Sequence, residues 1–336
     1  MTISVPVDRT VSDDLSFDQS IPRGIVHRES IAEVFLTDAV QTSRGAVFAA
    51  QLPRNHSYFS DHRGTATTYD PLLLVEVFRQ VAIYYAHSFA GVAASEKFVF
   101  VSADFEILDP ATLRIGGCPG HAVIEATVAG EKRREGELVG LTLEFVASIE
   151  GRPAARETMV YQWMPAAVWA RIRERARAAL DLPADYRIPE PPHVARLRPN
   201  SVGRHNPRNA ILANPSVVGE ELRALTVIDT DHPSLFDHAL DHVPGMLQFE
   251  AARQVAMAAA NARLGLDTNR MVMARFVIEF TRFGEFEIDT EARAVVSPSG
   301  ESGASAAVTI TQNDLPIAQG TVELHPLPVD VRTMVQ

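Results

Sequence analysis

Two matching stretches of sequence decide the fold: PLLLVEVFRQVAIYYAH at 71–87 and GMLQFEAARQVAMAAAN at 245–261. Each stretch is apolar nearly all the way around a helix, which is typical of a helix buried in a protein core. The polar residues that they share are spaced to fall on one narrow stripe of each helix. These shared positions are Glu76/Glu250, Arg79/Arg253 and Gln80/Gln254. The sequence therefore predicts two equivalent buried helices, each with one polar stripe.

The match between the two halves extends beyond these helices. VHRESIAEVFLTDA at 26–39 aligns with VGRHNPRNAILANP at 202–215 at an offset of 176, which pairs Arg28 with Arg204, and the helices align at an offset of 174. Each helix is followed by four segments of apolar or alternating residues, separated by glycine and proline turns, as expected of strands. The segments are 97–108, 121–129, 139–150 and 155–163, then 271–283, 291–298, 305–312 and 316–324. Two matches in the same order indicate a duplicated unit.

Between the halves, AAVWARIRERARAAL at 166–180 predicts a basic amphipathic helix that carries Arg171, Arg173, Arg175 and Arg177. The proline-rich run DLPADYRIPEPPH follows it and predicts an extended linker. We therefore expect an N-terminal arm at 1–24, a first domain at 25–164, a helix and linker at 165–194, and a second domain at 195–336.

Composition narrows the classes of function. The 336 residues carry 31 Lys and Arg against 42 Asp and Glu, a formal net charge of −11, which argues against nucleic acid as a partner. The single cysteine excludes an intramolecular disulfide and a cysteine-based zinc cluster. The first seventeen residues lack the apolar stretch of a signal peptide, and no apolar run reaches the roughly 18 residues of a membrane span. A cytoplasmic protein is expected, with neither a membrane nor a cofactor involved.

The polar stripes have two interpretations. A Glu and an Arg three residues apart on a solvated helix face form a weak ion pair and nothing more. On an otherwise buried helix, however, Glu76 and Arg79 must face each other or a cleft, since an unpaired buried charge costs several kcal/mol. Recurrence of the stripe at 250–254 favours a functional cleft.

A loop rich in His and Asp precedes each helix. In the second half it reads DTDHPSLFDHALDHVPGML at 229–247 and contains His238, Asp241, His242 and Gly245. Such histidines serve as turn or capping residues in many proteins, but several of them beside a buried glutamate also supply a general acid or base. No metal-ligand frame such as HExxH is present. The two loops differ where the helices begin, with Asp70-Pro71 in one and Pro244-Gly245 in the other.

These motifs resemble those of known families. The segment FDHALDHVPGMLQFEAARQ at 236–254 is similar to the loop and helix of the HotDog dehydratases of fatty-acid synthesis. A closer resemblance, spread over about 25–325, is to the A-factor synthase family, the double-HotDog enzymes of γ-butyrolactone and furan autoinducer biosynthesis. The motifs that carry it are VFLTD (34–38), QLPRNHSYF (51–59), YDPLLLVEVFRQ (69–80), LDHVPGMLQFEAARQ (240–254) and FTRFGEFE (280–287).

The resemblance implies an α+β protein with a tandem HotDog fold. Each half would be a curved antiparallel sheet wrapped around one long central helix, and the two halves would form an intramolecular pseudo-dimer. The implied activity is an acyltransferase that condenses a β-ketoacyl chain, bound as a thioester to acyl carrier protein, with dihydroxyacetone phosphate. The ester would then cyclise to a butenolide phosphate. A HotDog dehydratase or thioesterase, or a non-catalytic acyl-ligand-binding regulator, remains as an alternative.

The resemblance also suggests roles for residues. Glu250, with Glu76 second, would be a catalytic base whose pKa is raised by burial, and Arg253, with Arg79 as the alternate, would hold the phosphate. Backbone N–H groups near Gly245 and Met246 would stabilise an oxyanion. Further substrate-binding candidates are Gln80, Gln254, His238, Asp241 and His242. Phe78, Tyr84, Phe249 and Met257 would line an acyl tunnel, and Arg171, Arg173, Arg175 and Arg177 would dock the acidic carrier protein.

Overall fold

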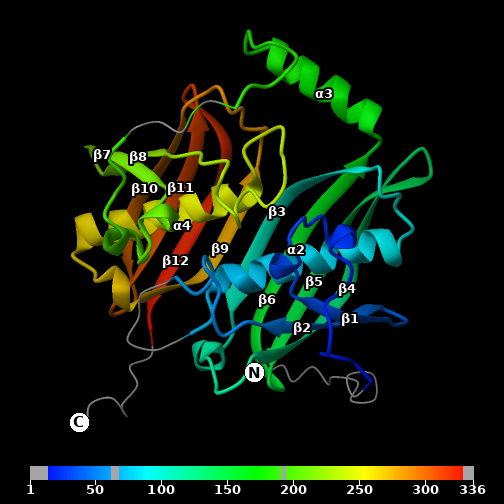
Figure 1. Ribbon diagram of the computed structural model, residues 1–336. Helices are drawn as coiled ribbons and strands as arrows, with labels where there is room; N and C mark the ends of the chain where they lie inside the picture. Colours follow the sequence, from blue (N-terminus) through cyan, green and yellow to red (C-terminus); the bar gives the residue numbers. More distant parts are fainter. Residues whose placement is uncertain (1–13, 62–67, 189, 191–193, 328–336) are drawn as a thin grey trace.

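The computed structural model describes residues 14–61, 68–188, 190 and 194–327 (Figure 1). Parts of the expected arm, of the linker and of the second domain, namely 1–13, 189, 191–193 and 328–336, lie outside the described residues, as does 62–67.

The order of elements repeats between the two halves, as predicted. The first half contains β1 (Leu36–Gln41), β2 (Gly45–Leu52), α2 (Pro71–Ser88), β3 (Lys97–Ile107), β4 (Gly120–Arg134), β5 (Glu137–Ile149) and β6 (Arg152–Met164). The second contains β7 (Leu212–Val218), β8 (Glu221–Thr226), α4 (Gly245–Leu264), β9 (Met271–Phe280), β10 (Thr290–Ser299), β11 (Gly303–Gln312) and β12 (Leu315–Pro326). Short 3₁₀ turns lie at η1 (Arg23–Val26), η2 (Ile31–Glu33), η3 (Pro110–Leu113), η4 (Pro199–Val202), η5 (Pro207–Asn209) and η6 (Thr268–Arg270).

The two halves share one sheet. Its strand order is β1-β2-β4-β5-β6-β3-β9-β12-β11-β10-β8-β7, and the halves meet where β3 pairs antiparallel with β9, from Ser102 opposite Glu279 to Glu106 opposite Arg275. Both long helices cross this sheet, with their N-terminal ends toward the middle of the molecule (Figure 1). The predicted α+β pseudo-dimer, with one long helix per antiparallel half-sheet, is confirmed. The division of the chain into domains at 25, 165 and 195 stays a prediction.

The two long helices begin differently. The side chain of Asp70 caps α2 by accepting a hydrogen bond from the Leu72 N–H at 2.9 Å, and Pro71 follows in the first turn, where no N–H is needed. Helix α4 has Pro244 at the corresponding position, and within the described part of the chain no side-chain hydrogen bond caps this helix. The N-terminal end of α4 is therefore left with hydrogen-bond donors that a ligand can use.

Helix α3 (Ala166–Ala178) is fastened to the second half by two of its arginines. Arg173 and Arg177 are buried and both bind the carboxylate of Glu285, at 2.5 Å in each case, while Arg177 also binds Glu287. The prediction that all four arginines dock a partner is wrong for Arg173 and Arg177, because both are buried and form ion pairs with Glu285. Arg171 and Arg175 are exposed.

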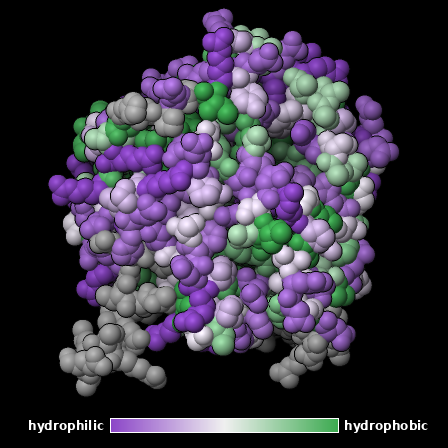
Figure 2. Space-filling model, viewed as in Figure 1, coloured by the Kyte–Doolittle hydropathy of each residue, from purple (hydrophilic) through white to green (hydrophobic). Residues whose placement is uncertain are grey.

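The surface seen in Figure 2 is mostly hydrophilic, with hydrophobic side chains in small groups. Among the helices that the structure describes, none is long and apolar enough to cross a membrane.

Candidate functional site

The polar stripe of α2 forms a cluster with an arginine that the sequence had not placed there. We call Arg28, Glu76, Arg79 and Gln80 the first cluster. Glu76 is fully buried, and its carboxylate accepts hydrogen bonds from Arg28 Nε at 3.0 Å, Arg79 Nε at 2.8 Å and Gln80 Nε2 at 2.7 Å. Burial alone would raise the pKa of Glu76, but the two guanidinium groups outweigh it and lower the pKa to about 2.

The stripe of α4 repeats this arrangement. The second cluster consists of Arg204, Glu250, Arg253 and Gln254. Arg204 Nε lies 3.0 Å and Arg253 Nη2 lies 2.7 Å from the Glu250 carboxylate, and Gln254 Nε2 donates to it as well. Burial opposes ionisation here too, yet Arg204 and Arg253 lower the pKa of Glu250 to about 2.

The expectation of a raised pKa is therefore wrong for both glutamates. The physical reason is a second arginine beside each glutamate, Arg28 for Glu76 and Arg204 for Glu250, whose positive charge lowers the pKa. Each of these arginines follows a 3₁₀ turn, η1 or η4, that is far from the helix in sequence. The aligned repeat had matched these two residues with each other, but nothing in the sequence gave them a role. A carboxylate with a pKa of about 2 is a weak base at neutral pH.

Each cluster is completed by the loop of the opposite half. Asp237 of the second half accepts hydrogen bonds from the backbone N–H groups of Glu29 and Ser30, at 2.7 and 2.9 Å. Its counterpart in the repeat, Asp61, accepts the N–H of Asn206 at 2.9 Å. The loop before α4 thus covers the first cluster, and the loop before α2 covers the second.

The second cluster is closed. The hydroxyl of Tyr58 donates to Glu250 at 3.0 Å, and its ring centroid lies 4.4 Å from the Arg204 guanidinium carbon. The carboxylate of Asp70 bridges the two guanidinium groups, 3.2 Å from Arg204 Nη1 and 3.5 Å from Arg253 Nη1. The cavity that borders Arg253 is only about 10 Å³. Glu250, Arg253 and Gln254, predicted to contact substrate, lie instead in a sealed network.

The first cluster is open because the repeat carries different residues at the two closing positions. Ser234 stands where the second cluster has Tyr58, and Pro244 stands where it has Asp70. A cavity of about 680 Å³ is lined by Ser234 and Pro244 together with Arg28 and Arg79. The small side chain of Ser234 in place of the large Tyr58, and Pro244 in place of the Asp70 carboxylate, leave room for a ligand.

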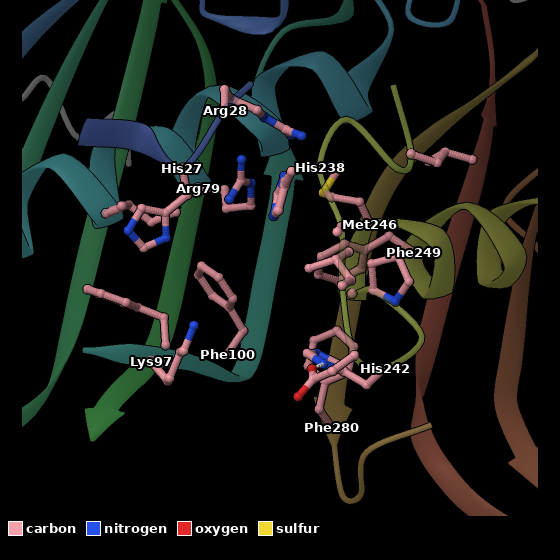
Figure 3. A pocket seen from close by; sticks show the side chains of 18 of the residues that line it. His27, Arg28, Arg79, Lys97, Phe100, His238, His242, Met246, Phe249 and Phe280 are labelled. Carbon is pink, nitrogen blue, oxygen red and sulfur yellow. Dashed lines mark hydrogen bonds and ion pairs between the residues drawn. The ribbon is translucent and has the colours of Figure 1, made fainter. Parts of the chain in front are cut away.

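The guanidinium groups at this end of the cavity have donors to spare. Within the described residues, Arg79 makes its recorded contacts through Nε and Nη2 and none through Nη1. Arg28 Nη1 lies 3.9 Å from Asp237 Oδ2, which is longer than a hydrogen bond. Figure 3 shows Arg28, Arg79 and His238 gathered at one end of the pocket. Burial and the two arginines lower the pKa of His238, so its ring is neutral at neutral pH.

The cavity becomes apolar away from these cations. Phe100, Met246, Phe249 and Phe280 line most of the walls away from Arg28 and Arg79, where Lys97 and His242 also lie (Figure 3). A second cavity of about 310 Å³ is lined mainly by apolar side chains, including Val99, Val101, Met164, Ile172 and Phe283. Both cavities are lined by Phe98, Phe100, His242, Gly245 and Phe280. The result is one cleft with a cationic end and an apolar end.

The predicted site residues therefore separate into groups. Arg79, His238, Asp241, His242 and Gly245 line the large cavity. Glu76 lies behind the arginines and holds them, and Gln80 supports Glu76 by donating to it at 2.7 Å while accepting the N–H of Phe35 at 3.0 Å. The predicted acyl tunnel is wrong in most of its members. Of its four residues only Phe249 lines the cleft, whereas Phe78, for example, packs in the core on Phe145 with ring centroids 5.1 Å apart.

Comparison with known proteins agrees with this architecture. The A-factor biosynthesis hotdog domain matches residues 10–165 and 188–328. The chain is 32% identical over 286 residues to 2-oxo-3-(phosphooxy)propyl 3-oxoalkanoate synthase of Streptomyces virginiae, covering 84% of this chain and 90% of that protein. It is 29% identical over 315 residues to the synthase of the same name from Streptomyces coelicolor, covering 90% and 91%.

Solved structures share the fold at low identity. The 12:0-ACP thioesterase from Umbellularia californica aligns with a TM-score of 0.50 and 13% identity, covering 83% of this chain and 94% of its own. The dehydratase domain of RzxB from Pseudomonas fluorescens aligns with a TM-score of 0.51 and 11% identity, covering 87% and 98%. Together with the two-part domain match, these confirm the predicted tandem HotDog fold. The chain belongs to the A-factor biosynthesis hotdog family.

Proposed function

We propose that this chain transfers a 3-oxoalkanoyl group from a thioester to a hydroxyl of dihydroxyacetone phosphate. The name of its Streptomyces relatives, 2-oxo-3-(phosphooxy)propyl 3-oxoalkanoate synthase, describes the ester that this transfer forms. The observation that carries the proposal is the cleft, which is cationic at one end and apolar at the other. A phosphorylated acceptor fits the first end and an acyl chain fits the second. The ester then closes by an intramolecular aldol-type step to a butenolide phosphate.

Arg28 and Arg79 bind the phosphate in this proposal. The closed second cluster supports it, because there the Asp70 carboxylate bridges Arg204 Nη1 and Arg253 Nη1. The corresponding arginines of the first cluster, Arg28 and Arg79, line a cavity with Pro244 in place of that carboxylate. A phosphate oxygen can occupy the equivalent position, and a guanidinium fork suits it well. Glu76 then orients the two arginines and takes no part in proton transfer.

The thioester carbonyl lies at the start of α4. Gly245 lines both cavities, and no side chain caps the first N–H groups of the helix. Backbone donors at a helix N-terminus stabilise the negative charge that develops on a carbonyl oxygen under attack, an effect of about 3–4 kcal/mol. The acyl chain then extends into the apolar second cavity. The N-terminus of α2 lacks this option because Asp70 caps it.

The thioester is carried by an acyl carrier protein that docks on α3. Arg171 and Arg175 are the two exposed arginines of the predicted basic face, and Ile172 between them lines the apolar cavity. We expect Arg171→Glu with Arg175→Glu to raise KM for a carrier-bound substrate at least fivefold by charge repulsion. KM for a small thioester mimic should not change. Equal KM values for the carrier-bound substrate in the variant and the parent chain would refute this docking surface.

The proposed activity is tested by product analysis. The chain is incubated with a 3-oxoacyl thioester mimic, with and without dihydroxyacetone phosphate, and the products are identified by mass spectrometry. We expect the ester or butenolide phosphate only when both substrates are present. Release of the free acid without the acceptor would instead indicate a thioesterase. In a parallel incubation with a 3-hydroxyacyl thioester, loss of water would indicate a dehydratase. Tight binding of the thioester without turnover in any of these incubations would indicate a regulatory binder.

A further inference from the structure

The two cavities of the cleft meet at a small set of residues that includes a histidine. If the phosphate lies at the Arg28 end and the acyl chain in the apolar cavity, the reacting carbonyl carbon lies at the junction between them. The residues common to both cavities are Phe98, Phe100, His242, Gly245 and Phe280. Of these five, His242 alone carries a titratable group, and Gly245 opens α4. The junction thus brings a proton acceptor beside the backbone donors of the helix.

His242 is held in one orientation by its neighbour in sequence. Its Nδ1 lies 2.6 Å from Asp241 Oδ1. Burial alone would raise the pKa of Asp241, but the hydrogen bonds from His242 and Trp169 and the nearby Arg173 guanidinium lower it, so the carboxylate is ionised and can only accept. The Nδ1 atom of His242 therefore donates to Asp241, and in the neutral imidazole Nε2 is the nitrogen left as an acceptor. The imidazole also packs against both Trp169 and Phe283, at centroid distances of 5.6 and 5.4 Å.

Asp241 is in turn held by helix α3. Trp169 Nε1 donates to Asp241 Oδ2 at 2.9 Å, and Arg173 Nη2 donates to the backbone carbonyl of Asp241 at 2.8 Å. Arg173 is one of the two buried arginines that fasten α3 through Glu285. A histidine oriented by an aspartate whose side chain and backbone are each held by a further donor is an arrangement suited to general acid–base catalysis.

Three other titratable groups near the cleft, Glu76, His27 and His238, are poorly suited to this role. Glu76 is saturated with donors and has a pKa of about 2. His27 contacts His87 through Nε2 at 2.9 Å, which engages that nitrogen. His238 lies at the phosphate end, and its Nδ1 is 3.6 Å from Asp237, longer than a hydrogen bond, so its tautomer is not held.

We propose that His242 is the catalytic acid and base of the acyl transfer and that Asp241 is its positioning residue; this inference rests on the proposed function. His242 Nε2 takes the proton of the acceptor hydroxyl as the hydroxyl oxygen forms a bond to the thioester carbon. The electron pair of the C=O bond moves to the carbonyl oxygen, which the N–H groups at the start of α4 stabilise. When the carbonyl re-forms, the C–S bond breaks, and Nε2 returns the proton to the thiolate sulfur. Thioester and alcohol become ester and thiol, and nothing else is consumed.

The test compares kcat with ligand binding in three variants of the full chain. We expect His242→Gln to lower kcat for ester formation by about 10²–10⁴-fold. The Kd for dihydroxyacetone phosphate should stay within threefold, since the phosphate lies at the other end of the cleft. Asp241→Asn should lower kcat at least tenfold with KM unchanged, because an amide can hold the wrong tautomer. His242→Gly should regain activity when imidazole is added.

A matched control is available in His325, which lies 3.8 Å from Glu323 on β12 and borders neither cavity. His325→Gln should keep the parent kcat. If the parent chain forms ester and His242→Gln retains kcat within threefold, or if imidazole fails to restore His242→Gly, the assignment of His242 is overturned while the proposed function stands. A parent chain that forms no ester overturns the proposed function and this assignment together.

Discussion

Replacing Ser234 with tyrosine is expected to abolish ester formation while leaving the fold intact. The repeat already contains this arrangement, because Tyr58 at the matching position fills the second cluster, donates to Glu250 and lies against Arg204. A tyrosine at 234 would occupy the end of the cavity that we assign to the phosphate. The Ser234 hydroxyl donates to Glu33 at 2.8 Å, and its loss should cost about 1 kcal/mol of stability.

The rate of ester formation, followed by mass spectrometry, should fall at least a thousandfold in Ser234→Tyr. The circular dichroism spectrum of this variant should match that of the parent chain. Ser234→Ala is the matched control, because it removes the same hydrogen bond without filling the cavity, and it should remain within tenfold of the parent rate. A Ser234→Tyr chain with activity similar to that of Ser234→Ala would show that the reaction takes place elsewhere.

Arg204→Met is expected to be among the most destabilising single substitutions in the chain. Arg204 is fully buried, and it binds Glu250 at 2.9 Å and Asp70 at 3.2 Å. Methionine would leave these two buried carboxylates to share Arg253. Breaking a buried ion pair by removing one partner costs roughly 3–5 kcal/mol.

Urea unfolding should show this loss as a lower midpoint in the absence of any substrate. Arg208 provides the comparison, since it is 43% exposed and lies 3.4 Å from Asp229 in a surface pair. Arg208→Met should change the free energy of unfolding by no more than about 1 kcal/mol. If Arg204→Met behaved like Arg208→Met, the second cluster would not be the sealed structural network described above.

Much of the fold could be predicted because the sequence of one half is repeated in the other. The buried helices at 71–87 and 245–261 align with each other, and alternating segments follow both, so the succession of helix and strands along each half could be predicted from local patterns. The basic helix at 166–180 could be predicted from its local amphipathic pattern. The burial of Arg173 and Arg177 could not be predicted, because their partner Glu285 is more than a hundred residues away and no local pattern marks it.

The site was only half predictable. Helical spacing brings Glu76 beside Arg79, so the sequence could indicate a polar stripe. It could not give the sign of the pKa shift, because Arg28 comes from a different segment and reverses the effect of burial. Nor could it identify the open cluster, since each cluster is closed or left open by the other half, through Tyr58 in one case and Ser234 in the other.

The central claim is that one site per chain, beside Arg28 and Arg79, receives the phosphorylated acceptor. Isothermal titration of dihydroxyacetone phosphate into the parent chain and into Arg79→Gln tests it most directly. We predict one molecule bound per parent chain and an affinity at least tenfold weaker in Arg79→Gln, a loss of about 1.4 kcal/mol or more. Two molecules bound per parent chain, or an unchanged affinity in Arg79→Gln, would contradict the claim.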